Sequence, residues 1–146
     1  MQQRCINRDE IYEKIKKEGG RLTKTKKAII DILFSADCFI SRKMLVKKLK
    51  DKKIKPDRST LYRDLKNLLA IGVLKQNYLS GESYYELLNK HHHHFICTNC
   101  FSFYNFYNFS SKNCITEKKY FKGNNFEILN HSFDFYGRCL NCLNKK

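Results

Sequence analysis

Apolar residues in the first half of the chain recur three or four positions apart, which is the spacing of one face of a helix. Four such stretches follow one another before residue 73, and they predict four short helices. Their expected buried positions are, in order, Ile11 and Ile15, then Ala28, Ile29, Leu33 and Phe34, then Leu45 and Leu49, and finally Leu61, Leu65, Leu68 and Leu69.

Residues with capping or helix-ending chemistry separate these stretches. The expected boundaries are Gly19-Gly20 after a first helix over 8–18, Thr23 and Ser41 as caps of the second and third helices, Asp57 or Ser59 as the cap of the fourth, and Gly72 after it. The charged stretch 50–55, followed by Pro56, is typical of a loop.

After Gly72 the pattern changes from helical spacing to that of a hairpin. Residues 73–78 and 83–88 read as two strands, and 80–82 as the turn between them. Short helices followed by a small hairpin are typical of a winged helix-turn-helix, whose fourth helix would enter the major groove of DNA. The exposed residues of that helix are Arg58, Ser59, Thr60, Tyr62, Arg63 and Lys66. The alternative is that they form only the solvated face of an amphipathic helix.

Charge agrees with a nucleic-acid partner. The 146 residues carry a net charge of +15, and residues 1–80 hold 21 Lys and Arg against nine Asp and Glu. Biased composition is the competing explanation, since Lys, Asn, Ile, Phe and Tyr are all frequent. The sequence has no run of 18 apolar residues and no secretory signal, so we expect a cytoplasmic protein without a membrane span. Cysteines in that compartment favour metal ligands over disulfides.

Two Cys-x-x-Cys pairs, Cys97 with Cys100 and Cys139 with Cys142, are the strongest chemical signal in the chain. Each pair can deliver two sulfurs to one tetrahedral zinc ion, and four thiolates leave no open position for catalysis. Because 38 residues lie between the two pairs, the metal would hold a whole subdomain together. Free buried thiols and a redox pair are the alternatives.

Four consecutive histidines precede the first Cys pair. On an extended segment, His92 and His94 face one side and His91 and His93 the other, so they can serve two different metal sites. Glu86 lies just before this run and offers a carboxylate. A solvated histidine run without a ligand role is the alternative.

Residues 89–146 predict a small α/β domain, after a DNA-binding domain over 1–88. The aromatic stretch 101–109 alternates as a half-buried strand does, and we expect it in a core or subunit interface rather than stacked on nucleic acid. Residues 110–121 read as a helix and 126–136 as a strand that contains His131. The fold class is therefore α+β.

These motifs together resemble the ferric uptake regulator family over roughly residues 12–142. The motifs that carry the resemblance are, in order, Gly20-Arg21-Leu22-Thr23, Ser59-Thr60-Leu61-Tyr62-Arg63, Tyr85-Glu86-Leu87, HHHHFIC, the first Cys pair, Asn130-His131-Ser132 and the second Cys pair. The resemblance implies a metal-dependent transcriptional repressor that binds operator DNA as a homodimer. It implies a winged helix followed by an α/β dimerisation domain.

The resemblance also assigns roles to residues. It implies structural zinc at the four cysteines, a regulatory divalent metal at Glu86, His92 and His94, and a further metal site at His91, His93 and His131. The regulatory ion would be Fe²⁺ or Zn²⁺, with Mn²⁺ or Ni²⁺ as alternatives. Tyr62 and Arg63 would contact the operator, and Arg21 would reach an A·T-rich minor groove.

The chain departs from the family pattern at the regulatory site. Phe39 stands where members commonly have a His, and Asn105 where they commonly have Asp or Glu. Lys112 stands near a position that often supplies another carboxylate. Cys38, beside Phe39, is a candidate substitute ligand, and a thiolate there would favour zinc over hard cations. These departures weigh against iron specificity and more strongly against peroxide sensing.

Two other classes of function are consistent with parts of the pattern. A constitutive winged-helix factor with structural zinc alone would explain the departures at Phe39 and Asn105. A zinc enzyme would need an open metal position and a base, and the sequence has no HExxH motif. Haem binding by the histidine run is a variant of sensing. We expect a regulator and not an enzyme.

Overall fold

A computed structural model describes residues 7–36, 39–88, 92–106 and 134–144. The chain divides into two compact units, residues 1–91 and 92–146. Within the described ranges, no helix has both the length and the apolar character needed to cross a bilayer.

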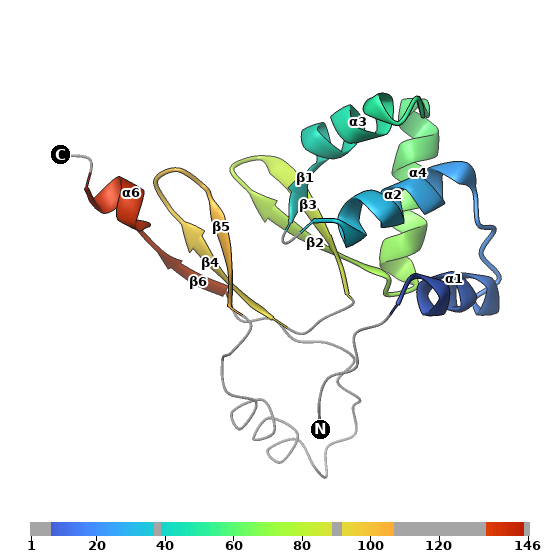
Figure 1. Ribbon diagram of the computed structural model, residues 1–146, viewed down its shortest axis with the longest axis horizontal. Coiled ribbons are helices and arrows are strands. Elements are labelled where there is room, and N and C mark those ends of the chain that lie inside the picture. Colours follow the sequence, from blue (N-terminus) through green and yellow to red (C-terminus); the bar gives the residue numbers. More distant parts are fainter. Residues whose placement is uncertain (1–6, 37–38, 89–91, 107–133, 145–146) are drawn as a thin grey trace, which may run out of the picture. The chain divides into compact units, whose positions relative to one another are not determined.

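The described part of the first unit contains four helices and a three-stranded antiparallel sheet (Figure 1). The helices are α1 (Arg8–Lys17), α2 (Lys24–Phe34), α3 (Arg42–Asp51) and α4 (Arg58–Ala70). The strands, in the spatial order β1-β3-β2, are β1 (Ile40–Ser41), β3 (Glu82–Leu87) and β2 (Leu74–Leu79). Helices α3 and α4 form the helix-turn-helix and β2-β3 the wing, so the predicted winged helix is confirmed.

The predicted caps begin these helices. The side chains of Thr23 and Ser41 each accept a hydrogen bond from the backbone N–H of the residue three positions later, as an N-cap does. Asp57, and not Ser59, caps α4. Gly19 and Gly72 adopt φ values of 71° and 63° directly after α1 and α4, a conformation that favours glycine.

The structure corrects some predicted boundaries. Helix α3 continues through Lys50 and Asp51, so the predicted loop over 50–55 begins two residues later. Neither residue breaks a helix, and the chain turns at Lys53, which has φ 58°. The wing strands lie within one residue of their predicted ends. Strand β1 was not predicted, because two residues are too few to show a periodic pattern.

Apolar faces of the four helices and the inner face of the sheet form one core. Its buried members include Ile15, Ile29, Leu45, Leu49, Leu65, Leu68, Leu74 and Leu87. Leu69 and Phe34, predicted to be buried, are half-buried and pack against this core. The core therefore sets the orientation of α4, whose opposite face is exposed.

The second unit contains a three-stranded sheet and a short helix among its described residues. In the spatial order β5-β4-β6 the strands are β5 (Phe103–Phe106), β4 (His93–Cys97) and β6 (Asp134–Gly137), and the helix is α6 (Leu140–Leu143). Strand β4 pairs antiparallel with β5 and parallel with β6. The α+β class and the sheet of the second domain agree with the sequence.

The described strands of this unit are shorter than the predicted ones. Phe101 belongs to the turn before β5, with φ 57°, instead of to the predicted strand 101–109. Strand β6 falls at the end of the predicted strand 126–136. The predicted helix over 110–121, together with His91 and His131, lies outside the described residues. Helix α6 was not predicted.

Candidate functional site

Four cysteine sulfurs meet in the second unit. The Sγ atoms of Cys97, Cys100, Cys139 and Cys142 all lie within 4.8 Å of one another. Because β4 and β6 are parallel, the residues that follow them lie at the same edge of the sheet. Each Cys pair begins at or just after one of these strand ends. The structure therefore brings together the four cysteines that the sequence predicts as zinc ligands.

The backbone around the first Cys pair is held on two sides. Phe101 N–H donates to the Cys97 carbonyl at 2.9 Å, which closes the turn. Thr98 N–H donates to the Gly137 carbonyl at 2.8 Å, which joins this turn to the end of β6. Cys139 N–H donates to Cys97 Sγ at 3.4 Å. The scaffold of the cluster is thus made of backbone hydrogen bonds between the two Cys-bearing segments.

The dimensions and donors of the cluster suit a tetrahedral metal ion. Metal–sulfur bonds of about 2.3 Å place the sulfurs of a tetrahedron about 3.8 Å apart. The sulfurs of Cys100 and Cys139 are 3.7 Å apart. Three of the thiols are buried and Cys100 is exposed. A metal held by four sulfurs has no open position, so its role would be structural.

The thiols of the cluster have unequal acidity. Hydrogen bonds from the backbone N–H groups of Cys139 and Cys100 lower the pKa of Cys97 to about 6. A hydrogen bond from Asn99 lowers the pKa of Cys142, but the neighbouring thiols, with Cys139 the largest contributor, and burial together outweigh it and raise the pKa to about 12. Four thiolates this close repel one another, and a divalent cation removes that repulsion.

Histidines in β4 and just before it form a second group of donors. His94 lies in the central strand and is 1% exposed, and its ring centroid is 4.6 Å from that of His92. The two rings therefore lie on the same side of the strand, as the alternation predicts. His93 is buried as well.

Asp134 is a candidate site residue that the sequence did not indicate. Its Oδ1 is 3.3 Å from Nδ1 of His94, and the two residues are register partners of the parallel pair β4-β6. A neutral imidazole that donates from Nδ1 carries its lone pair on Nε2, and a carboxylate partner of this kind orients metal-binding histidines. The sequence signal for a strand at this position was present, but its parallel pairing with β4 was not visible.

The structure also shows where the residues that depart from the family pattern lie. Phe39 is 8% exposed, and the Nζ of Lys75 lies 5.5 Å from the centroid of its ring. Glu86 is 7% exposed and lies in β3. In the other unit, Asn105 is the β5 register partner of His94. A phenyl ring offers no ligand atom and Asn105 offers a neutral carbonyl oxygen. Cys38 and Lys112 lie outside the described residues.

Helix α4 presents basic and aromatic side chains to solvent. Arg58, Tyr62, Arg63 and Lys66 are exposed, and Tyr62 is 63% exposed although it is aromatic. Arg21 is exposed between α1 and α2. These are residue types that bind phosphates and the edges of bases. The predicted recognition face is therefore accessible, except that Thr60, expected to be exposed, is half-buried.

Ser59 and Thr60 have a local bonding partner. Both hydroxyl groups donate to the Asp57 carboxylate, at 2.5 and 2.7 Å, and Thr60 N–H donates to it at 2.8 Å. These bonds hold the pKa of Asp57 well below its usual range, with the Ser59 hydroxyl as the largest cause. The two hydroxyl groups consequently turn their lone pairs, and not their protons, away from the helix end.

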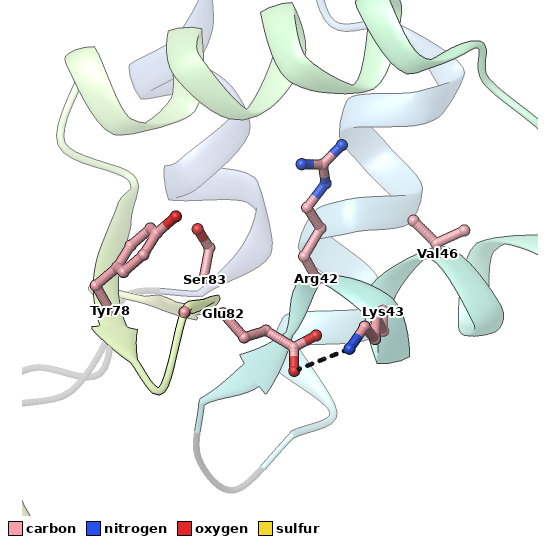
Figure 2. Close-up of a pocket in the computed structure, with 7 residues that line it drawn as sticks. Arg42, Lys43, Val46, Tyr78, Glu82 and Ser83 are labelled. Atoms are coloured by element: carbon pink, nitrogen blue, oxygen red, sulfur yellow. Dashed lines mark ion pairs between the residues drawn. The ribbon is translucent and has the colours of Figure 1, made fainter.

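A cavity of about 460 Å³ lies between the start of α3 and the turn of the wing (Figure 2). Arg42, Lys43 and Val46 line it from α3, and Tyr78, Glu82 and Ser83 from the wing. Lys43 Nζ and Glu82 Oε2 are 3.7 Å apart and connect the two sides. Lys43 is largely exposed, so this ion pair contributes little to stability.

Buried polar side chains join α4 to α2. Lys26 is 6% exposed, and its ammonium donates to the Asn67 side-chain oxygen at 2.7 Å and to the Arg21 carbonyl at 3.1 Å. The Thr23 hydroxyl donates to Asp64 at 3.2 Å. These bonds fix α4 against the segment that carries Arg21.

Residues 17–136 match the model of the ferric uptake regulator family. The ferric uptake regulation protein of Vibrio vulnificus is 32% identical over 130 residues, which cover 86% of this chain and 85% of the relative.

Solved structures of ferric uptake regulators have the same fold. The Helicobacter pylori regulator aligns with a TM-score of 0.75 at 23% identity, and 98% of each chain is covered. The Vibrio cholerae regulator, whose structure is described as showing a rearrangement of the DNA-binding domains, aligns with a TM-score of 0.65 at 28% identity. The alignment covers 87% of this chain and 98% of that regulator.

The winged helix, the clustered cysteines and these relationships agree with one another. The chain belongs to the ferric uptake regulator family, and it is a metal-responsive regulator of transcription and not an enzyme.

Proposed function

We propose that this chain is a homodimeric repressor that binds operator DNA when a regulatory metal ion is bound. The observation that carries the proposal is the exposed basic face of α4 in a winged helix whose chain also contains two sets of metal-ligand side chains. The relative from V. vulnificus bears the name ferric uptake regulation protein, which supports a role in metal homeostasis.

DNA would be contacted by α4 and by the segment before α2. Arg58, Tyr62 and Arg63 would reach base edges and phosphates in the major groove, with Ser59 and Thr60 at the start of the helix. Arg21 would enter a narrow A·T-rich minor groove, where the negative potential is enhanced. The excess of positive charge in residues 1–80 would strengthen binding at low salt.

Structural zinc would be held by Cys97, Cys100, Cys139 and Cys142. All four donors are sulfur, which selects zinc over hard cations, and the 3.7 Å between the Cys100 and Cys139 sulfurs fits a tetrahedron. The ion would neutralise the clustered thiolates and cross-link the ends of β4 and β6.

The second unit would form the dimer interface. In the described sheet, β5 and β6 are the outer strands, and both expose aromatic side chains. Tyr104 is 43% exposed and Tyr136 is 61% exposed. Exposed aromatic residues beside a sheet edge are typical of an interface, so a second copy of this chain is the partner we propose.

The regulatory ion would be held by Glu86, His92 and His94, with a further site at His91, His93 and His131. Imidazole and carboxylate donors suit Fe²⁺ and Zn²⁺, and also Mn²⁺ or Ni²⁺. Asp134 would orient His94. In terms of linkage, the metal binds the DNA-competent conformer more tightly and raises its population.

The experiment measures the affinity of zinc-loaded protein for an A·T-rich operator-like duplex by fluorescence anisotropy. Fe(II), Mn(II), Zn(II) and Ni(II) are titrated separately, with Fe(II) under anaerobic conditions. One metal should raise the affinity at least about tenfold, and the double variant His92→Ala/His94→Ala should lose this gain. An unchanged metal response in the double variant would contradict the proposed regulatory site.

A constitutive DNA-binding factor with structural zinc alone is the second candidate. Phe39 and Asn105 favour it, since neither offers the donor that the family pattern has at its position. This candidate predicts tight DNA binding that is the same with and without each added metal. It also predicts that removing the structural zinc weakens binding through loss of the dimer.

A further inference from the structure

A second cavity, of about 240 Å³, lies inside the helix-turn-helix. Its lining comes from α3, from the connection that follows α3 and from the start of α4. The apolar lining residues are Val46, Leu49, Ile54, Pro56 and Leu61. Leu49 and Leu61 are buried members of the core, and Val46 and Ile54 pack against it. The wall of this cavity is therefore aliphatic and continuous with the core of the first unit.

The connection between the two helices has a defined geometry. Lys53 has φ 58°, its N–H donates to the Lys50 carbonyl at 2.9 Å, and Ile54 N–H donates to the Leu49 carbonyl at 2.9 Å. These two bonds are those of a Schellman helix end, in which the residue at the position of Ile54 packs back against the one at the position of Leu49. The turn after α3 thus positions one side of the cavity.

Four cationic side chains complete the lining. Arg42 and Lys50 belong to α3, Lys55 to the connection and Arg58 to α4. None of the four forms an ion pair or a side-chain hydrogen bond within the part of the chain that the structure describes. No Asp or Glu is among the residues that line the cavity. Its charge is therefore positive and is not balanced from inside the fold.

Asp57 is the acid next to Arg58 in the sequence, and it does not supply the missing charge. Its carboxylate accepts hydrogen bonds from the hydroxyl groups of Ser59 and Thr60 at the start of α4. It does not line the cavity. The carboxylate is thus directed to the helix end and leaves Arg58 open to an external anion.

An aliphatic wall beside unpaired cations is complementary to a molecule with an alkyl chain and an anionic head. Carboxylates form strong charge-assisted bonds with Arg and Lys, and the alkyl chain gains by leaving water. At about 30 Å³ for each water-sized group, 240 Å³ corresponds to about eight such groups. This is the size of octanoate, whereas a membrane lipid is several times larger.

We propose that this cavity binds a medium-chain carboxylate, and that the bound carboxylate weakens binding to operator DNA. The second part rests on the proposed function, because it takes Arg58 as a DNA contact. The alkyl chain lies against the aliphatic wall, and the head group pairs with the cations around it. A carboxylate paired with Arg58 competes with DNA phosphates for the same guanidinium group. The regulator then responds to an organic acid in addition to a metal ion.

The first test measures octanoate binding to zinc-loaded full-length protein by isothermal titration calorimetry, without DNA and without further metal. One molecule should bind per chain, at least about tenfold more tightly than octanol or acetate. Octanol keeps the alkyl chain without the charge, and acetate keeps the charge without the chain. Equal affinities for octanoate and octanol would overturn the role of the cations.

Variants of the lining residues locate the bound molecule. Val46→Phe fills the cavity, and Lys50→Gln/Lys55→Gln removes two of its charges, so each should weaken octanoate binding at least about tenfold. Lys47→Gln/Lys48→Gln is the matched control, because these exposed lysines of α3 do not line the cavity. Circular dichroism checks the fold of Val46→Phe, and the double lysine variant changes exposed positions only. Unchanged octanoate binding by Lys50→Gln/Lys55→Gln would refute this site.

The second test measures the affinity for an operator-like duplex with Mn(II) present, in octanoate or in the same concentration of acetate. Acetate controls for ionic strength and for metal chelation by carboxylates. Saturating octanoate should weaken DNA binding at least about fivefold, and Lys50→Gln/Lys55→Gln should lose this effect. If octanoate binds and DNA affinity does not change, the competition at Arg58 is wrong.

Two further outcomes separate this proposal from the proposed function. If the double lysine variant binds DNA more weakly and no octanoate binds to the unmodified chain, the cations are phosphate contacts and the carboxylate site is wrong. If the duplex is not bound with any metal, the proposed function fails, while calorimetry still decides whether the cavity binds octanoate.

Discussion

Asp57 determines which hydrogen-bonding groups the start of α4 offers to a partner. Its carboxylate accepts one backbone N–H and two hydroxyl groups at the start of the helix. Since the protons of Ser59 and Thr60 point to Asp57, these residues offer acceptors and not donors to a partner. DNA phosphates are acceptors too, so phosphate contacts at this end are left to Arg58, and exposed base amino groups suit the two hydroxyl oxygens better.

The lowered pKa of Asp57 predicts a pH-dependent contribution to stability. A carboxyl group whose folded pKa lies below its ordinary value of 3.8 stabilises the fold above that value and loses this effect as the pH falls. Thermal melts followed by circular dichroism should show Asp57→Ala several degrees below the unmodified chain at neutral pH. The gap should shrink steadily from about pH 5 to about pH 2.

Asp57→Asn is the control for that series, because an amide can cap a helix but does not titrate in this range. Its melting temperature should approach that of the unmodified chain as the pH falls. A constant difference between the two proteins from neutral to acid pH would contradict the assignment of the lowered pKa to Asp57.

Helices α2 and α4 are connected by buried polar side chains as well as by the core. The Lys26 ammonium has two acceptors, Asn67 and the Arg21 carbonyl, and both belong to segments that carry proposed DNA contacts. A buried cation with fixed partners allows fewer orientations of two helices than an apolar contact does. This network therefore specifies how the recognition helix is presented.

Replacing Asn67 tests this network. Asn67→Leu leaves the Lys26 ammonium buried with one acceptor fewer, and it should lower the free energy of unfolding by about 2 kcal/mol in urea titrations. Lys66→Ala, an exposed change on the same helix, should alter it by less than about 0.5 kcal/mol. Adding Lys26→Met to Asn67→Leu should recover part of the loss, since no buried charge remains. If the double variant lost more free energy of unfolding than the two single variants together, this account would be refuted.

At the scale of the whole molecule, the basic helices lie in the first unit and the cysteine cluster lies in the second. The first has a core of helix and sheet side chains, whereas the described core of the second centres on Cys97, Cys139 and Cys142 with Phe95 packed against them. So small an apolar cluster is typical of domains that depend on a metal for stability. Loss of metal should accordingly affect the two units unequally.

The purified protein should contain one tightly held zinc per chain by elemental analysis. Cys142→Ser should lose this zinc and sediment as a monomer, while the first unit should keep its own unfolding transition in calorimetry. Cys5→Ser, which removes a thiol outside both pairs, should change neither quantity. Retention of both zinc and dimer by Cys142→Ser would show that the cluster does not hold the structural ion.

Local chemistry made much of the first unit predictable. Thr23 and Ser41 cap their helices as expected, and the apolar spacing of α1 to α4 identified most of the buried helix positions, although it missed Ile30 and Ile32 of α2. Cys-x-x-Cys spacing identified the sulfur cluster. Long-range pairing was not predictable, because it leaves no periodic signal. Strand β1, the parallel partner of β4 and the contact of Asp134 with His94 all depend on residues distant in sequence.

The parallel pairing of β4 with β6 gives the sulfur cluster an effect at the other end of the sheet. Side chains alternate along a strand, so slippage of β6 by one residue would turn Asp134 to the opposite face and away from His94. The backbone bonds and cysteines at the strand ends prevent such slippage, because they lock Cys97 opposite Gly137. A zinc ion bound by the cysteines would therefore keep the Asp134 carboxylate aligned with the His94 imidazole, three residue pairs away, without contacting either residue.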